Sequence, residues 1–406
     1  MTIVNDILKQ MPAVKQPQRK FLETLFATIL ALRGHVNFRN LSRYCDYSER
    51  TLARQFRHTF DWPDFHQRVI KLALKDSAEL LSVQDASFIP KSGKRTFGLG
   101  YFFNSCHARP ERGLEISNLA VVDVTRRCAF TLAVAQTPPA PAKASQPQRE
   151  ETLIDFYRQQ LRAQRQRLPP QITYHAVDGY FAKQKYIDEV VSLKLHPITK
   201  LRCDADCWFL YTGPHPPRRG RKRKYDGKVN WQDLSRFESL GTLAGEEHLH
   251  LYTAIVWHRS LKRKLRVVVL VNRKDPAQPR YIILASTDLE LDGRKLVEYY
   301  GARFQIEFLF RDSKQFTGLT DCQARAETAL AFHFNASLAT LNLVRAEELC
   351  AQPSGEPQVF SMASWKQRKF NERLLDLFIE QLALDPTWVK KQPCYDELRA
   401  YGAIAT

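Results

Sequence analysis

The chain has no hydrophobic run long enough to cross a membrane. Its longest apolar stretches, 24–32, 265–271 and 281–285, fall well short of the roughly 20 residues that a spanning helix needs. The N-terminal segment MTIVNDILKQMPAVKQPQRK lacks the apolar core and the small-residue cleavage site of a signal peptide. We therefore expect a cytoplasmic protein with no membrane partner.

Cysteine is too sparse to form a disulfide or zinc framework. Of the eight cysteines, only Cys203 and Cys207 lie close together, and no second pair completes a zinc-ligand pattern. Free thiols in a reducing compartment are expected. The sequence also shows no Ser/His/Asp or Cys/His arrangement, no P-loop, no dinucleotide-binding motif and no internal repeat. These absences argue against side-chain nucleophiles and against nucleotide hydrolysis.

Acidic residues are in the minority. Lysine and arginine number 61 against 43 aspartates and glutamates, which gives a formal net charge of +18 over 406 residues. Such an excess favours a polyanionic partner, and without a membrane segment that partner is expected to be nucleic acid. Hydrophobic residues make up 44% of the chain, enough for a sizeable core in two or three domains.

Residues 1–75 are predicted to form an all-α DNA-binding domain of the helix-turn-helix type. The segment 37–60 is typical of a short helix, a tight turn and a second helix with Ser48 as its N-cap. Three arginines share one face of the second helix: Arg50, Arg54 and Arg57. Two apolar residues lie on the opposite face: Leu52 and Phe56. A basic face of this kind suits the major groove, although an ordinary solvated arginine face gives the same pattern.

From residue 79 the sequence becomes rich in β-branched and aromatic residues. We expect strands at 80–88, 114–124, 128–137, 172–181, 200–213, 249–260, 264–273 and 279–287. Helices are expected at 150–167, 182–195, 293–316, 321–349 and 370–384. Strands followed by a helix, another strand and a further helix predict an α/β fold with a mixed sheet.

A strongly basic segment, GPHPPRRGRKRKYDGK, occupies 213–228. Its proline and glycine residues disfavour regular structure, and Arg221 and Arg223 lie in its most basic part. We interpret it as a clamp on the DNA backbone. The alternative is a solvated loop that contacts nothing specific.

The helix expected at 293–316 carries the most specific pattern. Four residues fall at spacing i, i+3, i+7 and i+14: Tyr300, Arg303, Glu307 and Lys314. At about 100° per residue they occupy an arc of roughly 60° on an otherwise apolar helix, which predicts a polar stripe lining a cleft. The spacing alone is also compatible with a simple i, i+4 ion pair.

This pattern matches without a gap the YREK signature, and the chain therefore resembles a large class of bacterial insertion-sequence transposases of the DDE superfamily. The likeness covers about 76–345 and implies an RNase H-like catalytic domain there, with a β-rich basic insertion at about 212–290. The remaining residues, 346–406, are expected to form a C-terminal helical region.

The resemblance implies three catalytic carboxylates that hold Mg²⁺, with Mn²⁺ as a possible substitute: Asp85, Asp178 and Glu307. Asp85 fits the first strand of such a fold and Asp178 the end of its fourth. The rival carboxylates fit less well. Asp123 is expected on the outer face of a strand, and Asp204 and Asp206 come one strand too late.

The same resemblance implies DNA contacts. Arg303 and Tyr300 would hold a phosphate near the transposon end, and Lys314 would contact the terminal phosphate. In several relatives a tryptophan stacks on a base that is flipped out during hairpin formation. This sequence offers Tyr281 instead, with Trp257 further upstream, so the hairpin step stays open. His333 is expected to be a core residue.

The favoured reading is a cut-and-paste DNA transposase of the bacterial cytoplasm, associated with the nucleoid. Its partners would be the double-stranded terminal inverted repeats and target DNA, and the resemblance implies a homodimer in the synaptic complex. Two alternatives remain: a helix-turn-helix regulator derived from a transposase and catalytically inert, and a cellular RNase H-like nuclease.

Overall fold

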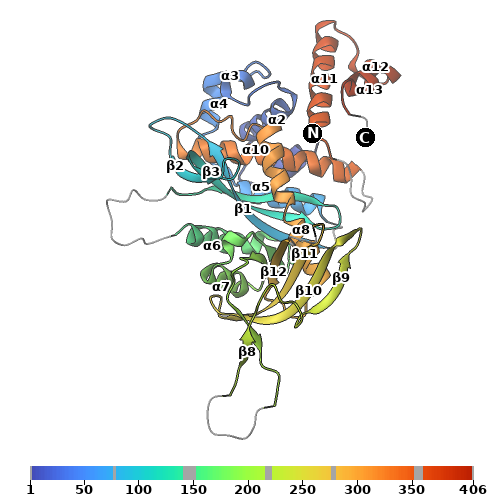
Figure 1. Cartoon of the computed structure of the whole chain (residues 1–406). Coiled ribbons are helices and arrows are strands. Elements are labelled where there is room, and N and C mark those ends of the chain that lie inside the picture. The colour runs from blue at the N-terminus through green and yellow to red at the C-terminus, as the bar shows by residue number, and fades with distance from the viewer. Residues whose placement is uncertain are drawn as a thin grey trace.

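The computed structural model describes residues 2–75, 79–139, 152–214, 222–275, 280–351 and 360–404. Within these ranges twelve strands join one mixed sheet, with helices packed around it (Figure 1). The strands are β1 (Leu80–Pro90), β2 (Gly100–Asn104), β3 (Arg109–Asp123), β4 (Cys128–Gln136), β5 (Tyr174–Ala176), β6 (His196–Leu201), β7 (Cys207–Leu210), β8 (Tyr225–Lys228), β9 (Glu238–Leu243), β10 (Glu246–His258), β11 (Arg263–Asn272) and β12 (Arg280–Ser286).

The α-helices of the described ranges are α1 (Thr2–Lys9), α2 (Gln16–Ala31), α3 (Phe38–Leu41), α4 (Glu49–Gln55), α5 (Trp62–Ala73), α6 (Leu153–Gln164), α7 (Gln184–Ser192), α8 (Gly293–Ala302), α9 (Gln305–Phe316), α10 (Glu327–Ala351), α11 (Met362–Gln381), α12 (Pro386–Lys390) and α13 (Pro393–Ala400). Two short 3₁₀ turns, η1 (Arg165–Arg167) and η2 (Gly179–Phe181), complete the set. No helix in these parts of the chain is long and apolar enough to span a membrane.

The order of strands in the sheet is β2-β3-β1-β5-β6-β12-β11-β10-β7-β8, with β4 pairing β3 and β9 pairing β10. β1 runs antiparallel to β3 and parallel to β5, and β5 runs parallel to β6. The sheet continues through β12, which is antiparallel to β6. The expected mixed α/β architecture is therefore confirmed.

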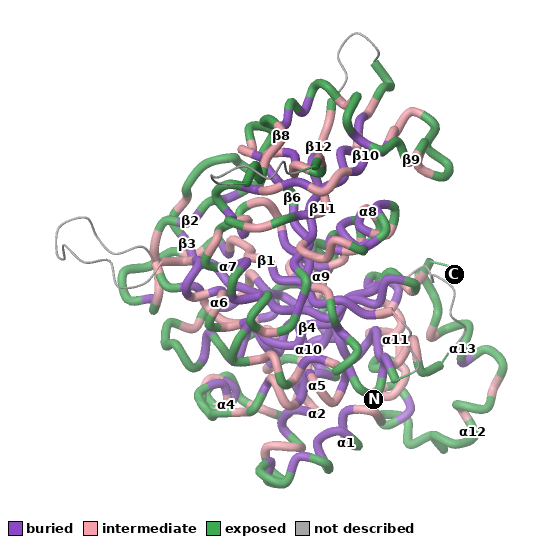
Figure 2. Tube along the Cα trace, turned by 90° about the horizontal axis from the view of Figure 1, so that it is seen from below, coloured by how far each residue is buried: buried purple, intermediate pink, exposed green. Residues whose placement is uncertain are grey.

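Three apolar clusters hold these elements together. One joins the N-terminal helices to α6, α7, α10 and strands β3 and β4. A second packs β1 and β3 against α8, α9 and α10. The third lies among β7, β10, β11 and β12. In Figure 2 the buried residues concentrate around α9, α10 and the central strands, whereas α12 and α13 are largely exposed.

The N-terminal helices pack directly on α10. The ring centroid of Phe332 lies 4.6 Å from that of Phe56 and 5.0 Å from that of Trp62. The expected N-cap of α4 is confirmed, because the Ser48 hydroxyl accepts a hydrogen bond of 3.2 Å from the Thr51 N–H. Since α4 ends at Gln55, Arg57 lies just past the helix rather than on it.

Three local expectations are wrong. The single helix expected at 293–316 is broken, because a tight turn at Arg303 and Phe304 separates α8 from α9. The strand expected at 200–213 is split between β6 and β7. Asp123 does not face outward; it is 2% exposed at the end of β3, where its carboxylate accepts from the Arg126 N–H at 2.8 Å and so caps the β3–β4 turn.

Candidate active site

The two aspartates lie side by side because of the register between β1 and β5. Ser82 pairs with His175 and Val83 with Ala176, an offset of 93 residues. The same offset places Asp178, just past the end of β5, next to Asp85 on β1. Neighbouring strands are about 4.8 Å apart, so a carboxylate in the middle of β1 meets one just past the carboxyl end of β5.

Arg303 connects Glu307 to this pair. Its Nη2 donates to a carboxylate oxygen of Glu307 at 2.8 Å, and its Nη1 lies 3.5 Å from a carboxylate oxygen of Asp85. The turn between α8 and α9 carries Arg303 and leaves Glu307 in the first turn of α9. The Arg303 guanidinium therefore connects Asp85 with Glu307, and Asp178 and Glu307 both lie close enough to Asp85 to affect its charge.

Asp85 is held in an unfavourable electrostatic setting. Burial, and next the neighbouring charge of Asp178, raise the pKa of Asp85 to about 7, although Arg303 and the Ala86 N–H act in the opposite direction. One carboxylate oxygen accepts from the Ala86 N–H at 2.8 Å. Asp178 accepts from the Tyr180 N–H, also at 2.8 Å. Among the described residues, Arg303 and two backbone N–H groups offset the charge of this carboxylate pair, so the pair favours a bound cation.

A buried chain of hydrogen bonds fixes the strands beneath the carboxylates. Ser82 Oγ lies 2.8 Å from His175 Nδ1, and His175 Nε2 lies 2.8 Å from the Tyr186 hydroxyl. Tyr186 in turn donates to the side-chain carbonyl of Gln84 at 2.6 Å. Since Gln84 precedes Asp85, this chain ties β1 to β5 and α7 directly below the site.

The donor set fits a hard divalent cation by its chemistry, because carboxylate oxygens are the ligands that Mg²⁺ prefers. Burial and the neighbouring Asp178 charge raise the pKa of Asp85, and a bound cation would offset both effects. Within the described ranges, no three ligating side chains are already grouped closely enough to enclose an ion. The Arg303 guanidinium stands between Asp85 and Glu307. Binding of a cation therefore requires Arg303 and Glu307 to separate.

Tyr300 and Arg303 are buried beside the carboxylates. Their side chains are stacked, with the guanidinium carbon 5.4 Å from the Tyr300 ring centroid. Arg303 Nε is buried and has no hydrogen-bond partner among the described residues. An unsatisfied guanidinium N–H in a buried position is a free donor for an anion.

Lys314, at the other end of α9, is a half-buried cation for which the structure gives no ion pair or hydrogen bond within the described ranges. Burial lowers the pKa of Lys314. It lines a cavity of about 360 Å³ together with Arg33, His35 and Lys366. Residues from α9, α11 and the connection that follows α2 thus place cationic groups around one hollow, in which Asp321 pairs with His35 at 2.9 Å.

The other predicted DNA contacts lie apart from the carboxylates. Arg50, Arg54 and Arg57 are exposed, whereas Leu52 and Phe56 are each 1% exposed, so the two faces expected of this segment are present. In the basic segment, Arg223 is exposed and stacks on Tyr211 at 4.8 Å. Arg221 lies outside the described residues.

The aromatic candidates for base stacking are both half-buried. Tyr281 pairs with Val271 and packs on the apolar cluster of β10, β11 and β12. The Trp257 ring lies 6.0 Å from that of Tyr225. His333 is the core residue that was expected, with Nε2 2.7 Å from the Gly318 carbonyl oxygen. All eight cysteines are free.

The rival aspartates on the β6–β7 connection are paired elsewhere. Asp204 is bound by Arg202 at 2.8 Å. Asp206 lies 3.4 Å from Arg259 and accepts from the indole N–H of Trp208 at 3.1 Å. Neither contacts Arg303 in the described structure.

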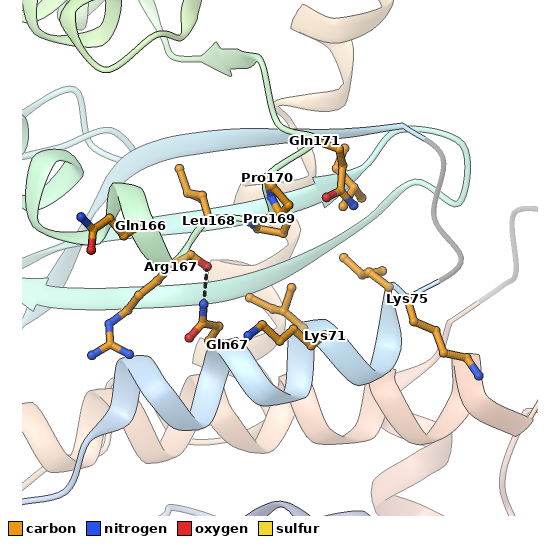
Figure 3. Close-up of a pocket in the computed structure, with 12 residues that line it drawn as sticks. Gln67, Lys71, Lys75, Gln166, Arg167, Leu168, Pro169, Pro170 and Gln171 are labelled. Atoms are coloured by element: carbon orange, nitrogen blue, oxygen red, sulfur yellow. Dashed lines mark hydrogen bonds between the residues drawn. The ribbon is translucent and has the colours of Figure 1, made fainter.

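A cavity of about 390 Å³ lies between α5 and the segment 166–171 (Figure 3). Its wall includes Lys71, Lys75 and Arg167, and the Gln67 amide donates to the Arg167 carbonyl at 3.0 Å. No acidic side chain is among the residues that line it. This hollow is separate from the carboxylate site.

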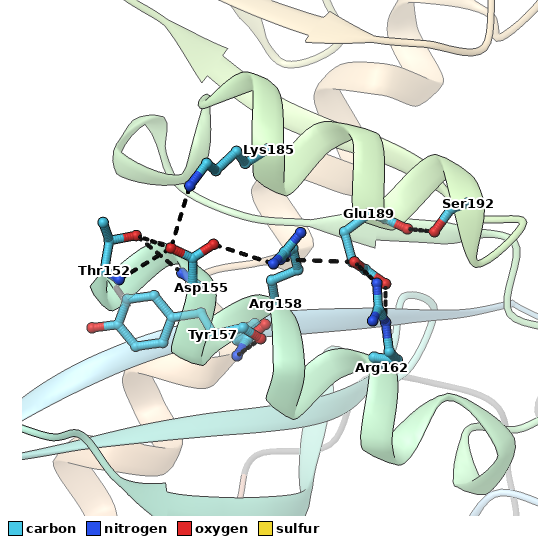
Figure 4. A network of polar contacts seen from close by, with 9 residues as sticks. Thr152, Asp155, Tyr157, Arg158, Arg162, Lys185, Glu189 and Ser192 are labelled. Carbon is cyan, nitrogen blue, oxygen red and sulfur yellow. Dashed lines mark hydrogen bonds and ion pairs between the residues drawn. The ribbon is translucent and has the colours of Figure 1, made fainter. Parts of the chain in front are cut away.

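A second cluster of charges joins α6 to α7 (Figure 4). Asp155 is bound by the Thr152 hydroxyl at 2.6 Å, by Arg158 at 3.2 Å and by Lys185 at 3.5 Å. Glu189 receives a two-pronged contact from Arg162, at 2.7 and 2.5 Å. Arg158 lies between the two carboxylates, and each has one further cation, Lys185 for Asp155 and Arg162 for Glu189.

Sequence reasoning missed two features of the site. It placed Arg303 on DNA and did not foresee its contact with Asp85, which depends on residues 218 positions apart. It also missed the strand β2, on which Tyr101 and Phe103 are 70% and 60% exposed. Alternating exposed aromatic residues within the basic segment 91–112 were the available signal.

Comparison with known families gives one match. The model described as "DDE superfamily endonuclease" matches residues 10–264, more than half of the chain. The matched range contains Asp85 and Asp178 and ends before Glu307. A comparison with curated proteins gives no match.

Among solved structures, the chain is similar to a piggyBac transposase in a synaptic complex with hairpin DNA. The TM-score is 0.44 and the sequence identity 12%, over 95% of this chain and 75% of that chain. A score below 0.5 establishes neither a shared fold nor a shared activity.

Proposed function

Because the chain belongs to the DDE superfamily endonucleases, we propose that it is a transposase of the YREK class found in bacterial insertion sequences. It cuts and joins DNA at the ends of its element. The observation that carries this proposal is that Asp178 and Glu307 both lie close enough to Asp85 to raise its pKa, while Arg303 contacts Asp85 and Glu307.

We propose that Asp85, Asp178 and Glu307 hold Mg²⁺, for which Mn²⁺ can substitute. When bound, the metal neutralises charge on the scissile phosphate and activates the attacking water or 3′-hydroxyl. The role of the protein's own side chains is to position the phosphate. Arg303 has two Nη donors and a free Nε for that task once Glu307 turns away, and the Tyr300 hydroxyl lies on the same side.

Lys314 is proposed to bind the terminal phosphate. Its lack of a counter-charge and the neighbouring Arg33, His35 and Lys366 support this role. Tyr281 remains the proposed partner of a flipped base, but its half-buried position leaves the hairpin intermediate an open element of the proposal.

The domain boundaries are part of the proposal. We assign 1–75 to DNA recognition, 76–345 to an RNase H-like catalytic domain with a β-rich insertion at about 212–290, and 346–406 to a helical region. Leaving aside the short edge strand β2, Asp85 lies on the first strand and Asp178 ends the fourth, which supports the RNase H-like assignment. Strands β8 to β12 fall within the insertion.

The proposed partners are double-stranded terminal inverted repeats and target DNA. Exposed Arg50, Arg54 and Arg57 would read the repeats, and Arg221 and Arg223 would grip the backbone. A homodimer would bring two ends together, in the bacterial cytoplasm at the nucleoid.

Cleavage by carboxylate variants tests the chemistry. Asp85→Asn, Asp178→Asn and Glu307→Gln are each expected to lower Mg²⁺-dependent strand cleavage by about a thousandfold or more, while DNA binding is kept. Asp204→Asn is the matched control and should cleave normally, because that carboxylate is exposed and paired with Arg202.

Normal cleavage by Asp178→Asn would remove that residue from the site and bring Asp204 or Asp206 into consideration. Wild-type protein that binds terminal repeats but never cleaves them in Mg²⁺ or Mn²⁺ would instead support the inert regulator.

Binding variants test the recognition surface. Replacing Arg50, Arg54 and Arg57 together with alanine should reduce the preference for terminal-repeat over random DNA by about tenfold or more, without affecting the fold. The readout is a competition gel shift. Neutralising Lys222, Arg223 and Lys224 is the control: it should weaken both duplexes equally and flatten the salt dependence. Unchanged discrimination in the triple arginine variant would contradict the assignment.

A further inference from the structure

The strand β2 exposes two aromatic rings at the edge of the sheet. Tyr101 and Phe103 are 70% and 60% exposed, whereas Phe102 between them is 4% exposed. Within the described residues, no aromatic ring and no cation is stacked on either exposed ring. Exposed aromatic rings with free faces are costly to leave in water, and Phe97, 46% exposed, adds a third nearby.

The register of the sheet places these rings on the face that carries Asp85. Asp85 is paired with Asn118 in β3, and Arg112, six residues away on the same face of β3, is paired with Tyr101. Pro110 is likewise paired with Phe103. Side chains alternate between faces along a strand, and neither pairing has a register shift, so Tyr101 and Phe103 project to the side of the carboxylates.

The distance between the two positions is set by strand geometry. Six residues of β3 span roughly 20 Å. A short stretch of extended single strand can cover that length. Near Asp85 the same face is covered by α9 (Gln305–Phe316), which packs on β1 and β3.

Lys314 lies between the two positions. It is about 10 Å from Glu307 along α9. At the far end, the turn between β2 and β3 lies close enough to Lys314 for Cys106 to oppose the lowering of the Lys314 pKa by burial. Lys314 has no hydrogen bond or ion pair within the described residues, so it offers a cation between the carboxylates and the aromatic edge.

The segment around the rings is basic. Between 91 and 112 there are five lysines and arginines, Lys91, Lys94, Arg95, Arg109 and Arg112, against one acid, Glu111. Arg112 is paired directly opposite Tyr101. Positive charge interleaved with exposed aromatic rings is the surface that binds single-stranded nucleic acid, because the cations hold phosphates and every base can stack.

We propose that Tyr101 and Phe103 form a stacking platform for unpaired bases of the DNA strand that leaves the active site. The proposal rests on the proposed function, since it assigns the platform to the DNA that this site cuts. It gives β2 the role of holding a strand once base pairing is lost, by ring stacking and without reading sequence.

Three fluorescently labelled probes test it: oligo(dT), a blunt duplex, and the same duplex with an oligo(dT) tail. Wild type is expected to bind the tailed duplex more tightly than the blunt one. In Tyr101→Ala/Phe103→Ala, the affinity for oligo(dT) should fall about tenfold or more, and so should the extra affinity that the tail gives to the duplex. The affinity for the blunt duplex should not change. A 2-aminopurine in the tail should lose its fluorescence quenching in the same variant.

Two further double variants sharpen the result. Tyr101→Leu/Phe103→Leu keeps the apolar surface but removes the flat rings, so it should bind oligo(dT) as weakly as the alanine variant. Phe378→Ala/Trp388→Ala removes equally exposed rings from α11 and α12 and should behave as wild type. Unchanged melting temperatures would show that all variants fold.

If the oligo(dT) tail raised the affinity for the duplex equally in wild type and in Tyr101→Ala/Phe103→Ala, the proposed platform would be wrong. Duplex recognition would not be affected by that result. Full oligo(dT) binding by the leucine variant would also overturn it and would favour an apolar protein contact. Ring-dependent oligo(dT) binding without any duplex binding would support the platform and overturn the proposed function. A wild type that binds none of the probes would overturn both.

Discussion

The α6–α7 cluster and the carboxylate site contain the same kinds of residue, but their charges are balanced differently. Between α6 and α7, Asp155 and Glu189 share three cations and the Thr152 hydroxyl. At the carboxylate site, one guanidinium contacts both Asp85 and Glu307, and Asp178 accepts a backbone N–H.

The two regions shift pKa values in opposite directions. Hydrogen bonds from Thr152 lower the pKa of Asp155, whereas burial and Asp178 raise the pKa of Asp85 to about 7. A compensated cluster stabilises the contact between two helices. In the carboxylate site, Asp85 lies near two other carboxylates and a single guanidinium, an arrangement that favours a bound cation. We therefore assign function to that site.

The largest effect on stability is expected when the α6–α7 cluster is broken. Glu189→Gln should lower the free energy of unfolding by about 2 kcal/mol, because it removes a buried charge that Arg158 and Arg162 face. Asp178→Asn should change it by less than about 0.5 kcal/mol, because it relieves repulsion. Urea denaturation measures both. Similar losses in the two variants would mean that the two clusters are balanced alike.

A smaller effect is expected when the shared cation is removed. Without metal, Arg303→Ala should be destabilised by about 1 kcal/mol, since Asp85 and Glu307 lose their counter-charge. Millimolar Mg²⁺ should restore its melting temperature by mass action. Arg162→Ala, the control in the other cluster, should not respond. Equal Mg²⁺ responses would show that the ion acts nonspecifically.

The smallest effect is a pH dependence. The pKa of Asp155 is lowered on folding, so its contribution to stability is present above the unfolded pKa, about 4, and is lost as the pH falls through the lower folded value. Asp155→Asn should therefore be less stable than wild type at pH 6, and the gap should close below pH of about 4. Melting temperatures across that range check it; a constant gap would exclude Asp155 as the titrating group.

Local signals in the sequence predicted many elements but not how they meet. The β-branched and aromatic content of the sequence after residue 79 predicted β1, and Ser48 marked the start of α4. The break between α8 and α9 has no proline to announce it. The apolar periodicity of 293–316 continues across it, so helical spacing alone could not reveal the turn at Arg303.

Long-range contacts account for the rest. The spacing motif pointed to Glu307 and the family resemblance implied Asp85 and Asp178; in the structure Asp178 and Glu307 both lie close enough to Asp85 to raise its pKa. The contact of Arg303 with Asp85 joins distant parts of the chain, as do the ion pairs of Glu189, 27 residues from Arg162. Asp123 was misjudged because strand alternation does not show that a strand end turns inward to cap the next turn.

The constant offset of 93 residues between β1 and β5 has a consequence for how this protein tolerates change. The two aspartates are aligned by backbone hydrogen bonds, which depend on strand pairing and not on the length of chain between the strands. Additions to the connections that precede β5 should leave the carboxylates facing one another. A single residue added inside β5, before Asp178, would turn that carboxylate to the opposite face. Chemistry here depends on the alignment of β1 with the three-residue strand β5, and the loops between the intervening elements can vary in length.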